Sequence, residues 1–253
     1  MLLIENLSVK RGSKQIINNV SLSLEKGKIY ALIGANGAGK STILEAIYQN
    51  INSSAKITLN NTLHTDKNYK DKIAFMVQQS LNDVSFSAIE VVLLAKLKDL
   101  GIVLKDSDLE FALKIMRDLN IEHLANMQIN MLSGGQKQMI AFAQVLAKEP
   151  ELLMLDEPVS ALDLHFQSLL LSELKKQVKS KNLISIVILH DLNLATLFCD
   201  ELIVLHDKSI IAQGNAKDIL NKELLKKIYK IDARIIYDED DTAFIQVLRP
   251  CND

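Results

Sequence analysis

One segment constrains the fold of this chain more than any other: residues 34–42, which read GANGAGKST. They match the pattern G-x-x-x-x-G-K-[ST] of loops that bind phosphate groups. The apolar run 29–33 precedes the segment and helix-favouring residues 41–48 follow it, so the glycines lie between a strand and a helix. Glycine lets the backbone wrap closely around an anion, and the N–H groups at a helix start attract its charge. The alternative is a glycine-rich turn that binds nothing, and it leaves the lysine and the serine unexplained.

The residue types in this phosphate loop (residues 34–42) have distinct expected roles. We expect the Lys40 ammonium to reach the β- and γ-phosphates of a nucleotide, and the Ser41 hydroxyl to bind Mg²⁺. The predicted nucleotide contacts within the loop are Gly34, Asn36, Gly37, Ala38, Gly39, Lys40, Ser41 and Thr42.

The rest of the chain reads as an α/β core with a helical insertion. Residues 2–10 and 16–24 alternate between apolar and polar, which indicates a β part at the N-terminus. Between 88 and 147 the apolar spacing is helical, with Asp106 and Ser107 as a predicted helix cap, and strands alternate with helices again from Leu152. Such alternation implies a mostly parallel sheet covered on both faces. In the tail we predict one helix over 216–229 and weak strands over 235–237 and 244–248.

Composition excludes several classes of protein. The formal net charge of −2 argues against broad nucleic-acid binding, which needs a basic surface. Two cysteines cannot form a disulfide framework, so we expect a reducing compartment. The longest aliphatic runs, such as 183–189, are far shorter than the ~20 residues that span a bilayer. We therefore expect a cytoplasmic chain whose membrane role, if any, comes through a partner.

Polar residues follow several of the predicted core strands. Asp156 and Glu157 end the buried strand 152–155, and His190 ends another. In a parallel sheet these ends share one edge with the phosphate loop. We expect Asp156 to hold Mg²⁺, Glu157 to accept a proton from an attacking water, and His190 to contact that water or the γ-phosphate. Gln78 is a further strand-end group that could contact the metal or the water, although any one such group by itself is often incidental.

A second glycine-containing helix start lies at residues 132–136, which read LSGGQ. We call these residues the serine–glycine segment, and its predicted nucleotide contacts are Ser133, Gly134, Gly135 and Gln136. One nucleotide has no evident use for two such sites in one subunit. A head-to-tail homodimer does, because the segment of one subunit would close over the phosphate held by the other.

Together these motifs and their order resemble the ATP-binding subunits of ABC transporters. Residues 34–42, 78, 132–136, 152–158, 160–163 and 190 are similar to that family's Walker A, Q-loop, signature, Walker B, D-loop and H-switch. The resemblance implies a P-loop NTPase (RecA-like) core with an inserted all-helical subdomain. It also implies that two copies sandwich two MgATP and drive a membrane permease. By the same resemblance Glu157 polarises the water, His190 links that water to the γ-phosphate, and Asp163 belongs to the D-loop. We predict a single domain over 1–253, with the core at 1–79 and 151–253 and the helical subdomain at 80–150.

A narrower resemblance concerns importers of iron-siderophore, haem and cobalamin. Residues 88–94, 189–195 and 224–232 are similar to that class. It implies a permease partner at the cytoplasmic side of the cell membrane and, indirectly, a substrate-binding protein. Phe86 and Ile89 lie where the family docks a permease helix, although both could equally belong to the core.

The chain departs from the family in three places. Arg11 stands near the position of an aromatic residue that stacks on adenine, and we hypothesise that its guanidinium partly substitutes. This substitution leaves the preference for ATP over GTP open. Gln78 is assigned by spacing within Val77-Gln78-Gln79, where a shift by one residue is possible, and Gln136 stands where close importer relatives often carry Glu.

Other functions fit parts of the sequence. An exporter ATPase would use the same chemistry, and an ATPase of iron–sulfur assembly is harder to separate from this chain. A DNA-repair ATPase would need a long coiled coil between the two glycine motifs, and no sustained heptads occur there. Translation ATPases carry two cassettes, whereas this chain has one. A binding module without catalysis is disfavoured because Glu157 and His190 are both present.

Overall fold

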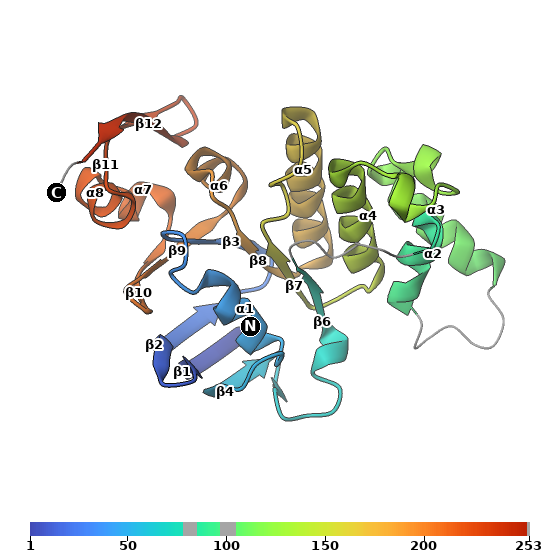
Figure 1. Ribbon diagram of the computed structural model, residues 1–253, viewed down its shortest axis with the longest axis horizontal. Helices are drawn as coiled ribbons and strands as arrows, with labels where there is room; N and C mark the ends of the chain where they lie inside the picture. The colour runs from blue at the N-terminus through green and yellow to red at the C-terminus, as the bar shows by residue number, and fades with distance from the viewer. Residues whose placement is uncertain (78–84, 97–104, 252–253) are drawn as a thin grey trace.

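Six strands form the central sheet of the computed structural model, which describes residues 1–77, 85–96 and 105–251. The order across the sheet is β10-β9-β3-β8-β7-β6, and all neighbours run parallel except β9 and β10 (Figure 1). The bounds are β3 (Lys28–Ile33), β6 (Ile73–Met76), β7 (Leu152–Asp156), β8 (Ile184–Ile188), β9 (Glu201–His206) and β10 (Ser209–Gly214). The five parallel strands therefore end at one edge of the sheet.

This sheet is buried on both faces, which explains its apolar strands. In β3, Tyr30 and Leu32 belong to one hydrophobic cluster, whereas Ile29, Ala31 and Ile33 belong to the other. Strands buried on both faces read as continuous apolar runs, as β7 and β8 also do. The predicted parallel core is confirmed.

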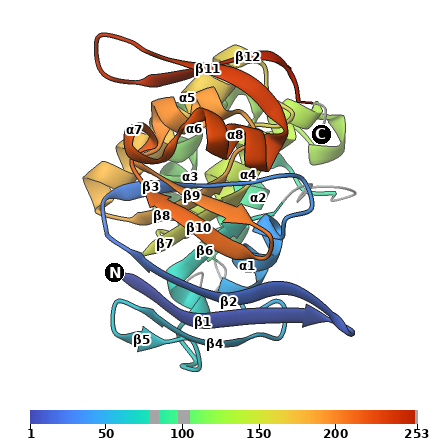
Figure 2. The same cartoon turned by 90° about the vertical axis from the view of Figure 1, so that its left-hand side faces the viewer.

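An antiparallel sheet lies against one side of the central sheet (Figure 2). Its order is β2-β1-β4-β5, from β1 (Leu2–Arg11), β2 (Lys14–Leu24), β4 (Ser54–Leu59) and β5 (Thr62–Leu63). The β4–β5 turn uses Asn60 and Asn61, whose φ angles are 45° and 67°. Asparagine tolerates this left-handed conformation, which two-residue hairpin turns require. The N-terminal antiparallel part is thus present as predicted.

Helices cover both faces of the central sheet. Helix α1 (Lys40–Ile47) packs in the cluster shared with the antiparallel sheet. The elements between β6 and β7 that the structure describes are all helical, and α2, α3 and α4 gather at one end of the molecule (Figure 1). Helices that contribute to the cluster on the other face include α2 (Ala88–Leu93), α3 (Asp106–Asp118), α4 (Gly134–Ala147), α5 (Leu164–Lys181), α6 (Leu192–Phe198) and α8 (Lys222–Tyr229). In the described part of the chain no helix is long and apolar enough to cross a bilayer.

Two local predictions were wrong. The α3 cap is Lys105 rather than Asp106 and Ser107, because Asp108 accepts a hydrogen bond from the Lys105 N–H at 3.1 Å. The predicted tail helix is two helices, α7 (Ala216–Ile219) and α8 (Lys222–Tyr229), because the Asn221 side chain caps a new helix by accepting from the Leu224 N–H at 2.8 Å. The tail strands are longer than predicted and form a hairpin of β11 (Ile231–Tyr237) and β12 (Ala243–Pro250).

Candidate functional site

The register of the central sheet places the predicted site residues together. Ile188 of β8 pairs with Leu32 of β3 on one side and with Asp156 of β7 on the other. The chain therefore leaves these three strands at the same level, into the phosphate loop, Glu157 and His190. The sequence argument from parallel strand ends gives this arrangement correctly.

The phosphate loop has the backbone that its glycines predict. Gly34, Gly37 and Gly39 have φ angles of 154°, 75° and 107°. A Cβ on Gly34 would lie 2.3 Å from the Leu205 carbonyl oxygen, so a larger residue cannot fit there. Gly39 is the N-cap of α1, and no side chain of the described residues caps that helix. Its first N–H groups are thus available for an anion.

Lys40 occupies the centre of the loop. Its ammonium donates to the carbonyl oxygens of Gly34 at 2.9 Å and Ala35 at 3.0 Å, and the residue is only 6% exposed. Burial lowers the pKa of Lys40, and the carboxylates of Glu157 and Asp156 oppose that shift. The Lys40 ammonium and the carboxylates of Asp156 and Glu157 therefore interact electrostatically across the site.

Asp156 is suited to bind a cation that is also held by the phosphate groups of a nucleotide. It is 7% exposed, and its Oδ1 has no hydrogen-bond partner among the described residues. Burial raises its pKa, although the neighbouring Ser41 hydroxyl acts in the opposite direction. No cluster of three His, Cys, Asp or Glu able to hold a metal occurs in the described ranges. The oxygens of Ser41 and Asp156 fit Mg²⁺ because this ion takes a few protein oxygens together with phosphate oxygens and water.

Glu157 and His190 form a close pair. The distance from Glu157 Oε1 to His190 Nε2 is 2.5 Å, at the point where the neighbouring strands β7 and β8 end. Glu157 has a φ of 52°, which is uncommon for a residue with a side chain and recurs at functional sites. A carboxylate that is held by an imidazole, at the edge of the sheet where the phosphate loop lies, can accept a proton from water.

The serine–glycine segment opens α4 with a capping box. The Gln136 N–H donates to Ser133 Oγ at 3.2 Å, and the Ser133 N–H donates to Gln136 Oε1 at 2.9 Å. A cavity of about 460 Å³ adjoins this helix start, and its described lining includes Gly134, Gly135 and Asp163 but no residue of the phosphate loop. Asp163 caps α5 by accepting from the Phe166 N–H at 2.9 Å. The described lining of this cavity thus contains the serine–glycine segment but no residue of the phosphate loop.

Two predicted site residues need separate comment. Arg11 ends β1 and forms an ion pair with Glu45 of α1 at 2.9 Å, with 61% of its side chain exposed. The pair ties the guanidinium to the helix of the phosphate loop. Gln78 lies outside the described residues.

We expect Arg11→Ala to weaken ATP binding about 2- to 5-fold, because a guanidinium stacked on a ring contributes about 0.5–1 kcal/mol at an exposed site. Titration with a fluorescent ATP analogue measures this change. Lys10→Ala is the matched control, since Lys10 is the adjacent exposed cation. Equal affinities of the Arg11 variant and the wild-type chain would exclude stacking by this residue.

Sequence reasoning missed two residues that touch the site. Gln138 of α4 donates to the Glu157 carbonyl oxygen, and its amide lies in a helix with no motif of its own to mark it. Tyr229, the last residue of α8, accepts a hydrogen bond from the Gly34 backbone N–H. Burial raises the pKa of Tyr229 to about 12. Only tertiary structure could have shown either contact.

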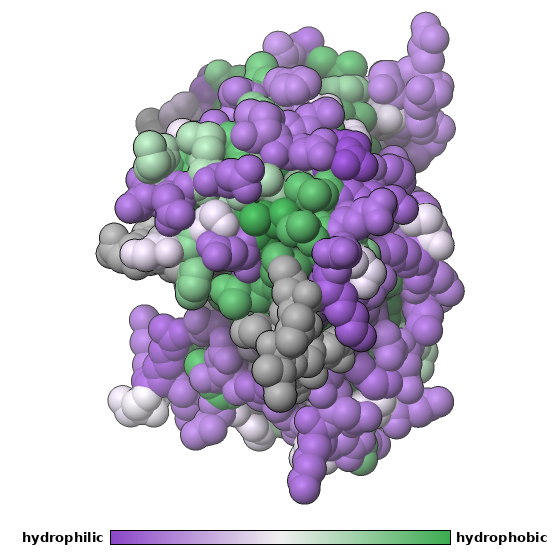
Figure 3. Space-filling model, turned by 90° about the vertical axis from the view of Figure 1, so that its right-hand side faces the viewer, coloured by the Kyte–Doolittle hydropathy of each residue, from purple (hydrophilic) through white to green (hydrophobic). Residues whose placement is uncertain are grey.

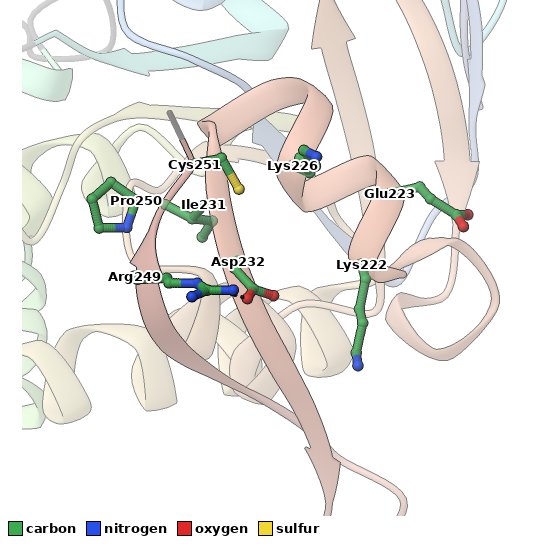
Figure 4. A pocket seen from close by; sticks show the side chains of 8 residues that line it. All are labelled: Lys222, Glu223, Lys226, Ile231, Asp232, Arg249, Pro250 and Cys251. Atoms are coloured by element: carbon green, nitrogen blue, oxygen red, sulfur yellow. Dashed lines mark hydrogen bonds and ion pairs between the residues drawn. The ribbon is translucent and has the colours of Figure 1, made fainter. Parts of the chain in front are cut away.

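A further pocket lies in the tail, between α8 and the β11–β12 hairpin (Figure 4). It measures about 500 Å³ and has a mixed polar lining, with Arg249 and Asp232 paired at 3.3 Å. Lys222 and Lys226 line it from α8, and Cys251 from the end of the chain. No residue of the predicted nucleotide site lines this pocket in the described part of the chain.

Comparison with known proteins decides the family. The ABC transporter family profile matches residues 17–160. The chain belongs to the ABC transporter family. The hemin import ATP-binding protein HmuV of Plesiomonas shigelloides is 34% identical over 251 residues, which cover 91% of this chain and 95% of that protein.

Solved ABC structures agree with this assignment. A chain named as an inward-facing metal-chelate type ABC transporter is 27% identical, with a TM-score of 0.82, covering 98% of this chain and 96% of its own. The cassette MJ0796, solved as a dimer with ADP and phosphate, is 28% identical, with a TM-score of 0.76, covering 85% and 98%. The predicted family and the P-loop NTPase fold are confirmed, and the chain is an ABC ATPase that binds and hydrolyses ATP.

Proposed function

We propose that this ABC ATPase energises an importer of metal chelates of the iron-siderophore, haem or cobalamin type. The observation that carries the proposal is the likeness to the hemin import protein along 91% of the chain. The likeness to a metal-chelate type transporter over 98% of the chain supports the same class.

The proposed catalytic roles follow from the geometry of the sheet edge. The phosphate loop and Lys40 bind the triphosphate, as the free N–H groups of α1 and the buried ammonium favour. Glu157 accepts the proton of the attacking water, and His190 holds that carboxylate from 2.5 Å. Ser41 and Asp156, with Gln78, are the proposed Mg²⁺ ligands. When bound, Mg²⁺ neutralises charge on the phosphate oxygens.

The proposed working unit is a homodimer that sandwiches two MgATP. Each chain has two anion-binding helix starts, at α1 and at α4, and the described lining of the cavity at α4 contains no residue of the phosphate loop. A head-to-tail pair uses both, with Ser133, Gly134, Gly135 and Gln136 of one subunit closing on the ATP held by the other. Asp163 lies beside them in the same cavity and would face the partner as well.

We propose residues 80–150 as a helical subdomain on a core of 1–79 and 151–253. The proposed permease site is the end of the molecule at which α2, α3 and α4 lie. Apolar side chains gather on that face (Figure 3). Phe86, which lies two residues before α2, is 43% exposed and suits a docked helix, whereas Ile89 is 8% exposed and belongs to the core. The subunit would thus sit peripherally on the cytoplasmic side of the cell membrane, with a substrate-binding protein as an indirect partner and no nucleic acid.

Reconstitution tests this proposal. The full chain is co-expressed with its permease, and the complex is placed in vesicles with haem, a ferric siderophore or cobalamin on the binding-protein side. We expect one of these chelates to raise ATP turnover and to accumulate across the membrane. Transport in the outward direction, or co-purification with soluble iron–sulfur assembly proteins in place of a permease, would contradict the proposal.

A further inference from the structure

One amide side chain joins α4 to the turn that carries Glu157. Gln138 is the fifth residue of α4 and is half-buried. Its Nε2 donates to the Glu157 carbonyl oxygen at 2.9 Å, and its Oε1 accepts from the Ala161 N–H at 3.1 Å. Because one end of the amide donates and the other accepts, only one orientation of the side chain satisfies both contacts.

The contacts of Gln138 hold the turn after β7, in which the Glu157 backbone has an unfavourable conformation. A φ of 52° is unfavourable for a residue with a side chain and persists only where the surroundings hold it. The Glu157 carbonyl oxygen also accepts from Ser160, from its N–H at 3.3 Å and from its Oγ at 3.1 Å. Of these three donors, Gln138 alone comes from another element. It therefore ties the backbone that aims Glu157 at His190 to α4.

The start of α4 is in close contact with the same turn. A Cβ on Gly135 would lie 3.1 Å from the Ala161 carbonyl oxygen and 3.4 Å from the Leu162 side chain. Gly135 thus packs directly against Ala161 and Leu162, so a shift of α4 reaches these two residues by direct contact. Gln138 extends this contact to Glu157.

We propose that Gln138 positions the catalytic carboxylate of its own chain relative to α4. The start of α4 contacts the nucleotide held by the partner subunit, whereas Glu157 acts on the nucleotide held by its own chain. Gln138 thus makes the placement of the base at one site depend on how α4 sits at the other. This inference rests on the proposed dimer and on Glu157 as the base, and it makes Gln138 a positioning residue.

Steady-state kinetics of two variants test the contact. Gln138→Leu keeps the size of the side chain and removes both hydrogen bonds. We expect its kcat to fall about 5- to 30-fold, the effect of one or two lost hydrogen bonds, with KM for ATP within about 2-fold of wild type. Gln138→Glu keeps an acceptor for the Ala161 N–H but cannot donate to Glu157, so its kcat should fall as well.

The matched control is Gln144→Leu, because Gln144 lies on the same helix and its side chain makes no hydrogen bond to the described residues. It should keep wild-type kinetics. A purely structural role for Gln138 predicts a lower melting temperature and unchanged kcat. Wild-type turnover of Gln138→Glu beside a slow Gln138→Leu would place the effect at Ala161 and overturn the inference.

Mixed dimers show through which chain Gln138 acts. Two differently tagged chains are co-expressed, and one carries Glu157→Gln so that a single base remains. Gln138→Leu in that same chain should leave the turnover of the mixed dimer within about 2-fold, because the remaining base keeps its own Gln138. The same change in the opposite chain should lower turnover about 5- to 30-fold.

The outcomes separate this inference from the function on which it rests. Equal effects in both arrangements, or a larger effect in the chain that carries Glu157→Gln, overturn the inference and leave Glu157 as the base. A wild-type chain that does not dimerise with ATP, or that keeps full turnover when Glu157→Gln is in both chains, refutes the proposed dimer or base instead. If Glu157→Gln in one chain already abolishes ATP hydrolysis at both sites, the kcat values of the homodimeric Gln138→Leu and Gln138→Glu variants test the inference instead.

Discussion

Glu157→Gln is expected to bind ATP normally and to lose turnover by about 100-fold or more, the range that a general base contributes. The amide has the size of the carboxylate and can still form a hydrogen bond with His190, whose Nε2 lies 2.5 Å from Glu157 Oε1. It cannot accept a proton from water. Because hydrolysis is the step that would release the two subunits, the variant should accumulate as an ATP-bound dimer. Phosphate release and gel filtration with ATP measure the two effects.

The control for this variant is Glu149→Gln, which removes a carboxylate that is paired with Lys96 at 3.1 Å. Surface ion pairs of this kind contribute little to stability, so its turnover should match wild type. Normal turnover in Glu157→Gln would show that another group activates the water. Loss of ATP binding in that variant would show a damaged site rather than a missing base.

The site could be predicted because its residues lie at strand ends. Parallel strands share the edge at which they end, so a sequence that places the phosphate loop, Asp156 and His190 at the ends of buried runs already implies that they meet. The register confirms this expectation, since Ile188 pairs with both Leu32 and Asp156. Apolar runs and glycine loops are local signals, and the parallel architecture converts them into three-dimensional proximity.

Contacts made by ordinary polar side chains could not be predicted. Gln138 resembles any other amide in α4, and its two bonds depend on how α4 packs against the turn after β7. The ion pair of Arg11 with Glu45 depends likewise on the approach of two distant elements. The break between α7 and α8 had a local signal, the Asn221 cap, but the helical spacing on both sides concealed it. Capping residues and amides are common, and tertiary context decides which of them act.

Lys40→Ala is expected to weaken ATP binding or turnover about 100-fold or more, similar to the loss when one stabilising donor is removed from an active site. The ammonium is buried, donates to the Gly34 and Ala35 carbonyl oxygens, and balances Glu157 and Asp156. Its removal takes one donor from the Gly34 carbonyl oxygen, whereas the Ala35 carbonyl oxygen keeps the Ala38 N–H at 3.2 Å. It also removes the ammonium near two carboxylates, so an anionic triphosphate meets a more negative site.

Three variants separate charge from shape at this position. Lys40→Met keeps the apolar stem and should fail as Lys40→Ala does, whereas Lys40→Arg keeps the charge but brings a planar fork that does not reproduce the compact ammonium. The double variant Lys40→Ala with Glu157→Gln should not accumulate as an ATP-bound dimer, because the trapped state requires the triphosphate to be held first. Nucleotide titration and gel filtration measure both effects. A trapped dimer in the double variant would show that the loop backbone and α1 hold the phosphates without the lysine.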